Sequence, residues 1–382
     1  MHGQLGSHAA TAVPATGGTL LATGGGACLI KAATVLLHSN TTLRCERTAY
    51  LGIDLAPAVA TVSLFKNVNW QAAAVTDRNI TVRDCSFVWK KWWRGNPAKS
   101  LEFWHVDNVR VINNHFSAGG NATAMIGSTH TNTEGNFVFG VTNACFDYWA
   151  GGGWHRIVNN FCHAAANSTL NSFAIQLSAA DFAGKAAMDI NDVVIAGNTL
   201  MKDGDFWAAI GTNGTGAVNN LTVEGNHIYL TGSGGVFSTT ATAASGIMIA
   251  DKGVTRKTIA NNTITGAGLW PSIWLYSGSD VRVVNNTLYN CAYASGTYGN
   301  SIAPNTAYTF TGNIQLVPGT RTTVTGNRSR NCSGTLISAD TSPADTIGAN
   351  GDGSGMPGSP APVPTANTGT GLGGQIRRHA GH

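Results

Sequence analysis

The stretch VRVINNHF (109–116) recurs along the chain in altered form, each time as a short β-type run that ends in asparagine before an apolar or small residue. The other copies are TEGNFVF (133–139), RIVNNFC (156–162), VVIAGNTL (193–200), LTVEGNHI (221–228), KTIANNTI (257–264), VRVVNNTL (281–288) and TTVTGNRS (322–329). With the second asparagine taken where there are two, the aligned residues are Asn114, Asn136, Asn160, Asn198, Asn226, Asn262, Asn286 and Asn327. Subtraction gives spacings of 22, 24, 38, 28, 36, 24 and 41 residues. A minimum near 22 with larger irregular values predicts a solenoid, in which a constant turn carries insertions that project as loops.

A second apolar run precedes the Asn-ended run in most repeats, as in KSLEFWHV (99–106), NACFDYWA (143–150) and PSIWLYS (271–277). Two or three strands per repeat predict an all-β fold, a single-stranded right-handed parallel β-helix. Asparagine suits its turns because it tolerates left-handed backbone and its amide can bond to the asparagine one coil away. A β-sandwich is the competing fold, but a sandwich would not reuse one Asn-ended strand eight times.

Composition favours strands and tight turns over helices. The 382 residues include 48 glycines and are only 11% charged, which leaves too few Lys, Glu and Arg to cover helix surfaces. A net charge of +4 without a concentrated basic stripe does not favour nucleic acid as a partner. No apolar run approaches a membrane span, so we expect no membrane partner, and the N-terminus lacks the apolar stretch of a signal peptide.

Three segments are expected along the chain. Residues 1–16 are small and polar and are expected to form a flexible leader. Residues 17–345 carry the repeats and should form the β-helix domain. Residues 346–382 are rich in Gly, Pro and Ser, bury little apolar surface, and are expected to form a flexible tail.

The seven cysteines include no C-x-x-C pair, which argues against a zinc site. Cys85 and Cys162 fall near the aligned asparagine, where a small buried residue is expected. We therefore favour buried free thiols in a stacked core over a disulfide framework. No cluster of histidines or carboxylates has the spacing of metal ligands, so neither a metal nor another cofactor is expected.

These repeats resemble those of the pectin-lyase-like superfamily, which includes pectate lyases, polygalacturonases, alginate epimerases and bacteriophage tailspikes. The resemblance implies a polysaccharide that lies in a groove along one long sheet, and an extracellular or virion-surface location. It also implies a homotrimer if the chain is a phage tail protein. The catalytic signatures of the polygalacturonases, pectate lyases and epimerases do not appear, so the resemblance identifies no subfamily.

Strand alternation indicates which side chains face that groove. In LEFW (101–104) the apolar Leu101 and Phe103 should point inward, which leaves Glu102 and Trp104 outside. By the same rule the other outward residues of these runs include Asp147, Trp149, Gln176, Trp274 and Tyr276.

Glu102 and Asp147 are the candidate catalytic pair. Glu102 lies 12 residues before Asn114 and Asp147 lies 13 before Asn160, so both should face outward with one coil between them. Two coil spacings separate them by roughly 10 Å. This is close to the carboxyl separation of an inverting glycosidase, in which one acid protonates the leaving oxygen and one base activates water. Which residue is acid and which is base stays open, and two merely exposed carboxylates are the alternative interpretation.

The other candidate residues would bind substrate or assist. Trp104, Trp149, Trp207, Trp270 and Trp274 would form a row of flat platforms for sugar rings. Arg94, in the loop after Trp89, could bind acidic groups of a glycan, although Trp- and Arg-bearing loops also form oligomer contacts. His130 could serve as a base or orient a carboxylate, and His155 begins the strand after Asp147.

Three functions remain open. Hydrolysis is preferred over elimination, because elimination needs a cation beside the uronate and no basic residue falls on the inferred groove strands. A non-catalytic carbohydrate-binding or adhesin-like β-helix would share the tryptophan row and differ only in lacking turnover.

Overall fold

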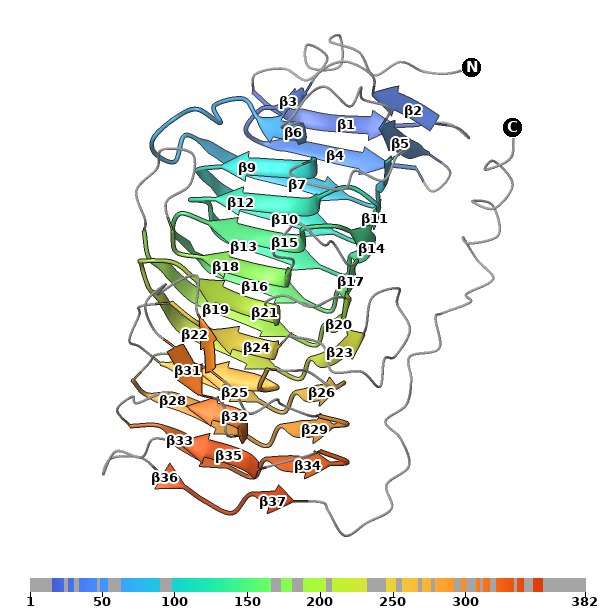
Figure 1. Ribbon diagram of the computed structural model, residues 1–382. Coiled ribbons are helices and arrows are strands. Elements are labelled where there is room, and N and C mark those ends of the chain that lie inside the picture. Colours follow the sequence, from blue (N-terminus) through green and yellow to red (C-terminus); the bar gives the residue numbers. More distant parts are fainter. Residues whose placement is uncertain are drawn as a thin grey trace, which may run out of the picture.

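The computed structural model describes residues 16–23, 27–30, 34–46, 49–53, 63–89, 98–165, 173–180, 188–203, 208–231, 245–251, 256–266, 270–275, 279–291, 297–299, 307–309, 312–316, 321–332, 335–339 and 346–352. All regular structure in these ranges is β-strand, wound as the stack of coils in Figure 1. Successive strands pass in turn through three parallel sheets, named sheet A, sheet B and sheet C in the order of the chain. The predicted all-β parallel β-helix is thereby confirmed.

Sheet A has 12 strands. They are β1 (Gly18–Ala22), β4 (Thr41–Cys45), β7 (Asp77–Arg83), β10 (Val106–Ile112), β13 (Thr129–Glu134), β16 (Gly152–Val158), β19 (Ile190–Ala196), β22 (Val218–Glu224), β25 (Lys257–Ala260), β28 (Val281–Val284), β33 (Thr323–Thr325) and β36 (Thr346–Ile347).

Sheet B also has 12 strands. They are β2 (Ala27–Ile30), β5 (Tyr50–Ile53), β8 (Ser86–Trp89), β11 (His115–Ser117), β14 (Phe137–Val141), β17 (Phe161–Ala164), β20 (Thr199–Asp203), β23 (His227–Thr231), β26 (Thr263–Thr265), β29 (Thr287–Tyr289), β34 (Arg328–Arg330) and β37 (Gly351–Asp352).

Sheet C has 11 strands, and two further strands pair antiparallel outside the three sheets. Sheet C contains β3 (Val35–Leu37), β6 (Ser63–Asn67), β9 (Lys99–Trp104), β12 (Asn121–Ile126), β15 (Ala144–Trp149), β18 (Phe173–Ser178), β21 (Ala208–Asn213), β24 (Ser245–Ile249), β27 (Ile273–Leu275), β32 (Gly312–Leu316) and β35 (Thr335–Ala339). The antiparallel pair is β30 (Thr297–Gly299) with β31 (Ala307–Thr309).

The aligned asparagines form a buried ladder at the turn between sheet A and sheet B. Asn198 is typical: its Oδ1 accepts from the backbone N and the Nδ2 of Asn160, at 2.9 and 3.0 Å. Its own Nδ2 donates to the backbone oxygen of Ile157 and to Oδ1 of Asn226, at 2.8 and 2.9 Å. The same contacts link the asparagines from Asn114 to Asn327, so each amide satisfies backbone groups of the turn that no sheet bond reaches.

The residue before each ladder asparagine explains the Asn-Asn and Gly-Asn pairs of the sequence. Asn159 and Gly197 both have positive φ, at 56° and 64°, as do their counterparts in the other coils. Asparagine and glycine are the residues that adopt this left-handed conformation at least cost. At Gly197 an added Cβ would also lie 2.6 Å from Oδ1 of Asn159, which selects glycine there.

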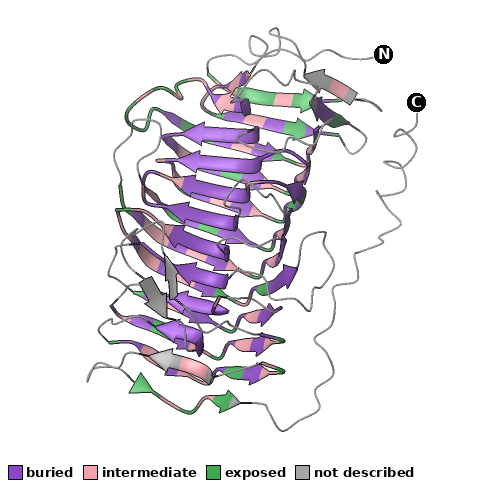
Figure 2. Cartoon of the chain, viewed as in Figure 1, coloured by how far each residue is buried: buried purple, intermediate pink, exposed green. Residues whose placement is uncertain are grey.

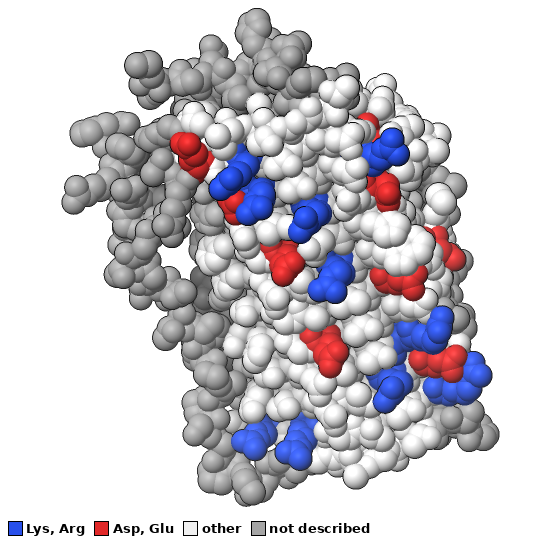
Figure 3. Space-filling view, turned by 180° about the vertical axis from the view of Figure 1, so that it is seen from behind, with Lys and Arg blue, Asp and Glu red and all other residues white. Residues whose placement is uncertain are grey.

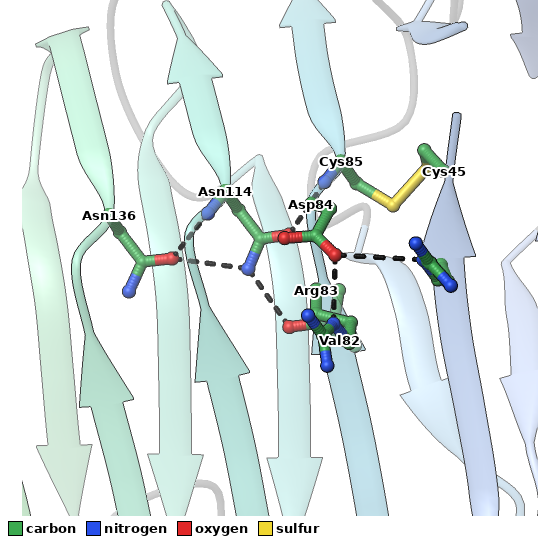
Figure 4. Close-up of a disulfide and its surroundings, with 8 residues drawn as sticks. Cys45, Val82, Arg83, Asp84, Cys85, Asn114 and Asn136 are labelled. Carbon is green, nitrogen blue, oxygen red and sulfur yellow. Dashed lines mark hydrogen bonds and ion pairs between the residues drawn. A yellow bond between two sulfur atoms is a disulfide. The ribbon is translucent and has the colours of Figure 1, made fainter. Parts of the chain in front are cut away.

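The ladder extends beyond the repeats that the sequence reveals. At one end, the backbone N of Cys85 donates to Oδ1 of Asn114 at 3.0 Å, so Cys85 occupies the ladder position of its coil (Figure 4). At the other end, Asn327 donates to Asn350 through both its backbone N and its Nδ2. The strands β36 and β37 therefore continue the coil to Asp352, past the boundary expected at residue 345. Most of the expected leader and tail lies outside the described residues.

The interior of the coil is one continuous apolar core of stacked aliphatic and aromatic side chains. Phe87 stacks on Phe116 of the next coil with ring centroids 4.8 Å apart, and Phe65 meets Phe87 edge-on at 5.9 Å. Inward residues of successive coils lie directly above one another, so each coil buries its apolar side chains against the coils before and after it.

Six of the seven cysteines are joined in disulfides, Cys45–Cys85, Cys145–Cys162 and Cys291–Cys332, and Cys28 is free. The expectation of buried free thiols is therefore wrong. The first and third disulfides each join adjacent coils, and the second links sheet C to sheet B within one coil. Figure 4 shows the first, beside the start of the ladder. Cys45 and Cys85 are 40 residues apart in sequence, and they meet only because the coils stack.

We expect thiol labelling to report these bonds directly. In protein produced in an oxidising compartment, iodoacetamide should modify one cysteine in unfolded, unreduced chains and seven after reduction. Reduction should also lower the free energy of unfolding, since closing a 40-residue loop contributes about 4 kcal/mol. Intact-mass measurement counts the labels, and more than one label before reduction would contradict the assigned disulfides.

Candidate functional site

Glu102 and Asp147 lie on the outer face of sheet C. In β9, Leu101 and Phe103 belong to the interior core, whereas Trp104 belongs to a separate apolar cluster with Ala124 of β12. The alternation predicted from the sequence is therefore confirmed. Glu102 pairs in register with Ala124, and Ala124 pairs with Asp147 of β15. One strand thus separates the two acidic residues, which corresponds to roughly 10 Å between their backbones.

Glu102 is held by three donors on the same face. Ser63 Oγ donates a hydrogen bond to it, Lys66 Nζ lies 3.0 Å from its Oε2, and Lys99 Nζ lies 2.6 Å from its Oε1. Burial by itself would raise the pKa of this carboxyl. The charges and hydrogen bonds of Lys99, Ser63 and Lys66 outweigh burial and lower the pKa of Glu102 to about 2. Glu102 is therefore ionised at neutral pH.

Asp147 has the opposite environment, although it lies on the same face. Its side chain accepts a hydrogen bond from Asn121 Nδ2 at 3.0 Å, and no residue forms a salt bridge with it in the described part of the chain. Burial is the dominant influence and raises the pKa of Asp147 to about 7, against the lowering effects of Lys99, Trp149 and Asn121. The nearby Glu102 charge raises it further. Near neutral pH a large fraction of Asp147 therefore carries a proton.

This raised pKa predicts a pH-dependent effect of Asp147→Asn on stability. A carboxyl whose pKa is about 7 when folded and about 4 when unfolded contributes its full stabilisation below pH 4 and loses it as the pH rises to 7. Relative to wild type, Asp147→Asn should therefore gain about 4 kcal/mol in free energy of unfolding between pH 4 and pH 8. Urea unfolding at the two pH values measures this gain, and a difference independent of pH would contradict the raised pKa.

The outer face of sheet C is covered, as the buried colouring of its strands in Figure 2 shows. Glu102 and Asp147 are each only 3% exposed. The predicted row of exposed tryptophans is wrong for Trp104 and Trp274, which are buried, while Trp149 is half-buried. Trp270 of the predicted row is half-buried and meets Trp274 with ring centroids 5.7 Å apart, while Trp70 meets Trp104 at 6.1 Å. Alternation predicts which face a side chain occupies but not what covers that face.

Comparison with known proteins agrees with this architecture. The family model for a right-handed β-helix region matches residues 239–350. No curated protein matches the chain in sequence. The chain is similar in structure to a family 28 exopolygalacturonase of Yersinia enterocolitica, with a TM-score of 0.53 and 13% identity over 88% of this chain and 73% of that one. It is equally similar to PfbA, a surface adhesin of Streptococcus pneumoniae, with a TM-score of 0.53 and 13% identity over 90% and 84%. The chain therefore folds as a right-handed parallel β-helix.

A third similar structure has a lower TM-score. The tailspike protein of Escherichia coli bacteriophage HK620, in complex with a pentasaccharide, gives a TM-score of 0.47 and 10% identity over 89% of this chain and 73% of that one. At 13% identity, the likenesses to the exopolygalacturonase and to PfbA show the fold alone.

Two histidines of this β-helix were expected near the carboxylates, and the structure places both in sheet A. His130, in β13, is exposed; its Nδ1 lies 2.6 Å from Oδ1 of Asp107, and its ring stacks on Trp154. It therefore contacts neither Glu102 nor Asp147 through any described interaction.

His155, in β16, points into the core of the β-helix, where its Nδ1 lies 2.9 Å from Thr131 Oγ1 and its ring packs against Tyr148. Burial, with a smaller effect of His130, lowers the pKa of His155 to about 3. The expected substrate-binding role of His155 is therefore wrong, because an interior side chain cannot touch a glycan on the outer face. Gln176 of β18 does continue the outer column, in register with Asp147. Arg94, Trp207 and Tyr276 lie outside the described residues.

Sequence reasoning missed the two lysines of this site. Lys66 of β6 pairs in register with Glu102, and Lys99 opens β9. The inference that no basic residue falls on these strands is therefore wrong. No repeat of the sequence identified the strand of Lys66. Cys85 stands at the ladder position of this region in place of asparagine, so the region could not be aligned with the Asn-ended repeats.

Other features of the β-helix point to no further site of this kind. In the described part of the chain, a surface pocket is lined by Leu21, Arg44, Cys45, Glu46 and Asp84. These residues belong to the first coils and lie away from Glu102 and Asp147. In the described ranges, no three His, Cys, Asp or Glu side chains come together as metal ligands would. Those ranges also contain no helix with the length and apolarity needed to cross a membrane.

Proposed function

We propose that this β-helix binds a polysaccharide chain along sheet C and hydrolyses it with inversion. One observation carries the proposal: two carboxyls on the same outer face, one strand apart, have their pKa values moved in opposite directions, to about 2 and about 7. Pairs of acids separated in this way by their surroundings supply the acid and the base of many hydrolases.

The pKa values support one assignment of the roles that the sequence left open. Asp147, protonated near neutral pH, donates its proton to the glycosidic oxygen as the bond to the anomeric carbon breaks. Glu102, already ionised, accepts a proton from the water that attacks the same carbon from the opposite side. The roughly 10 Å spacing of the backbones suits a water between the two groups, as inversion requires. Because both carboxyls are buried, turnover requires that the covering of sheet C is displaced by substrate.

The location follows from the same proposal. Three disulfides in the described residues fit an oxidising environment, outside the cell or on a virion surface. The similar exopolygalacturonase and surface adhesin support a polysaccharide-binding or polysaccharide-degrading protein there.

A glycan-degradation screen tests the proposal. Purified protein is incubated with acidic and neutral polysaccharides, and each reaction is followed by reducing-end release and by absorbance near 235 nm. Hydrolysis gives new reducing ends without absorbance. Absorbance at 235 nm would instead show elimination, for which Lys66 and Lys99 could neutralise a uronate. Wild-type protein that degrades no polymer in the panel would overturn the enzymatic proposal.

A non-catalytic carbohydrate-binding protein is the second candidate. The observation that favours it is the burial of Glu102, whose carboxylate is already saturated by Ser63, Lys66 and Lys99. Retention of a polysaccharide in affinity electrophoresis, with no cleavage over long incubation, would select this candidate.

A further inference from the structure

A second column of left-handed residues runs along the start of sheet A. Nine of these residues lie six positions before the ladder residue of their coil, as Asn108 does before Asn114 and His130 does before Asn136, and Asn40 lies opposite Asn79 in the coil before. All ten members have φ between 43° and 63°. They are Asn40, Asn79, Asn108, His130, Trp154, Asp192, Asn220, Arg256, Asp280 and Arg321.

Short polar residues are the ordinary occupants of this column. Six of the ten are asparagine or aspartate, which adopt left-handed backbone at least cost among residues with a Cβ. Their side chains bond from coil to coil: Asn79 Nδ2 donates to Asn40 Oδ1 at 2.8 Å, and Asn220 Nδ2 donates to Asp192 Oδ1 at 2.8 Å.

His130 and Trp154 depart from this pattern in adjacent coils. Tryptophan in a left-handed conformation is a backbone outlier, and such outliers persist where the surroundings or a function hold them. The imidazole and the indole stack with centroids 4.6 Å apart and planes 1° apart. Asp107 fixes the imidazole through the 2.6 Å contact to Nδ1 and itself accepts from Thr129 Oγ1 at 2.8 Å.

The result is a flat, oriented aromatic platform on the surface. The side chain of Trp154 is 56% exposed, which is more than any other exposed Phe, Tyr or Trp in the described part of the chain. His130 lies against one face of the indole, and the next member of the column on the other side is the short Asp192. The polar groups of Asp192 and Asn220 therefore lie in the coils that follow the indole.

We propose that Trp154 is a carbohydrate-binding subsite on sheet A, where a pyranose ring stacks on the indole and its hydroxyl groups bond to the column residues beside it. A flat ring supported from behind and bordered by hydrogen-bonding side chains is what a sugar needs, because a sugar has apolar C–H faces and polar edges. This subsite lies on a different sheet from Glu102 and Asp147, and it does not depend on hydrolysis by them.

The surroundings favour a sugar over a protein partner. Protein interfaces bury a continuous patch with an apolar centre. Outer positions of sheet A instead include the exposed Arg110, Arg156 and Glu224. Seen from behind, the molecule shows acidic and basic side chains interspersed on its surface (Figure 3). A single indole among such residues is too small for a protein interface but matches one sugar ring.

Trp154→Asn is the informative variant, because asparagine is the residue that other coils use at this position. It removes the platform and should leave the thermal midpoint unchanged or raised. The probes are soluble neutral and acidic polysaccharides in affinity gel electrophoresis, which gives a dissociation constant for each polymer. We expect Trp154→Asn to weaken binding of at least one polymer about tenfold, since one aromatic stack contributes on this scale. His130→Asn should weaken it less.

Phe137→Ala is the matched control, because Phe137 is an exposed aromatic residue of sheet B, outside the column. It should bind as wild type does. Equal binding by wild type and Trp154→Asn, or no binding of any polymer by wild type, would overturn the proposal. A wild type that sediments as an oligomer, with a monomeric Trp154→Asn, would also overturn it, because the indole would then contact a second copy of the chain.

Discussion

Asn198→Ala should lower the free energy of unfolding by more than the loss of any one hydrogen bond of the ladder would. The substitution removes the Oδ1 that accepts from Asn160 N and Nδ2, and the Nδ2 that donates to Ile157 O and Asn226. The backbone N of Asn160 is then buried without its partner, and each such group costs about 1–3 kcal/mol. We expect a loss of about 4 kcal/mol, measured by urea unfolding under non-reducing conditions.

Asn219→Ala is the control for this prediction. Its Nδ2 donates to Asn191 Oδ1 at 3.0 Å on the partly exposed face of sheet A, so its loss should cost about 0.5 kcal/mol. Equal destabilisation by the two variants would mean that the ladder contributes no more than an ordinary surface contact. If Asn198→Ala were as stable as wild type, the ladder would not contribute to the stability of this fold.

Asp147→Asn and Glu102→Gln should each reduce glycan hydrolysis about a thousandfold, the usual contribution of a general acid or base. Both substitutions keep the shape of the side chain and remove the proton transfer. Rates are measured by reducing-end release on the polymer that wild type degrades best. Glu134→Gln, in sheet A and hydrogen-bonded to Asn132, is the matched control and should keep wild-type activity.

The pH profile provides a second test of the assigned roles. Because Asp147 must be protonated and has a pKa of about 7, the rate should fall tenfold per pH unit above pH 7. Glu102 has a pKa of about 2, so the rate should show no acidic decline through the range in which the protein is folded. A rate that rises above pH 7 would reverse the roles, and full activity in Asp147→Asn would exclude Asp147 from the chemistry.

Periodicity was sufficient to predict much of this architecture. The Asn-ended runs predicted the coils, and alternation within LEFW (101–104) placed Glu102 and Trp104 on the outer face. Both predictions depend on short-range properties, namely the left-handed tolerance of asparagine and the two-residue period of a strand.

Other features could not be predicted, because they depend on which coils become neighbours. Cys45 meets Cys85 across a 40-residue separation, and Lys66 reaches Glu102 from a coil that has no ladder asparagine. His155 begins the strand after Asp147, and its place in the core follows only from its register with Val193, an interior residue of the next coil.

By itself the sequence determined the coil, its ladder and the two faces of each strand, because these follow from residue-by-residue backbone preferences repeated at a recognisable spacing. Only the tertiary structure decided that the outer face of sheet C is covered, that Glu102 lies between two lysines, and that Asp147 retains a proton near neutral pH. Burial and charge depend on which residues the stacking of coils brings together. Because the loops between strands differ in length, the spacing of residues along the sequence does not predict these neighbours.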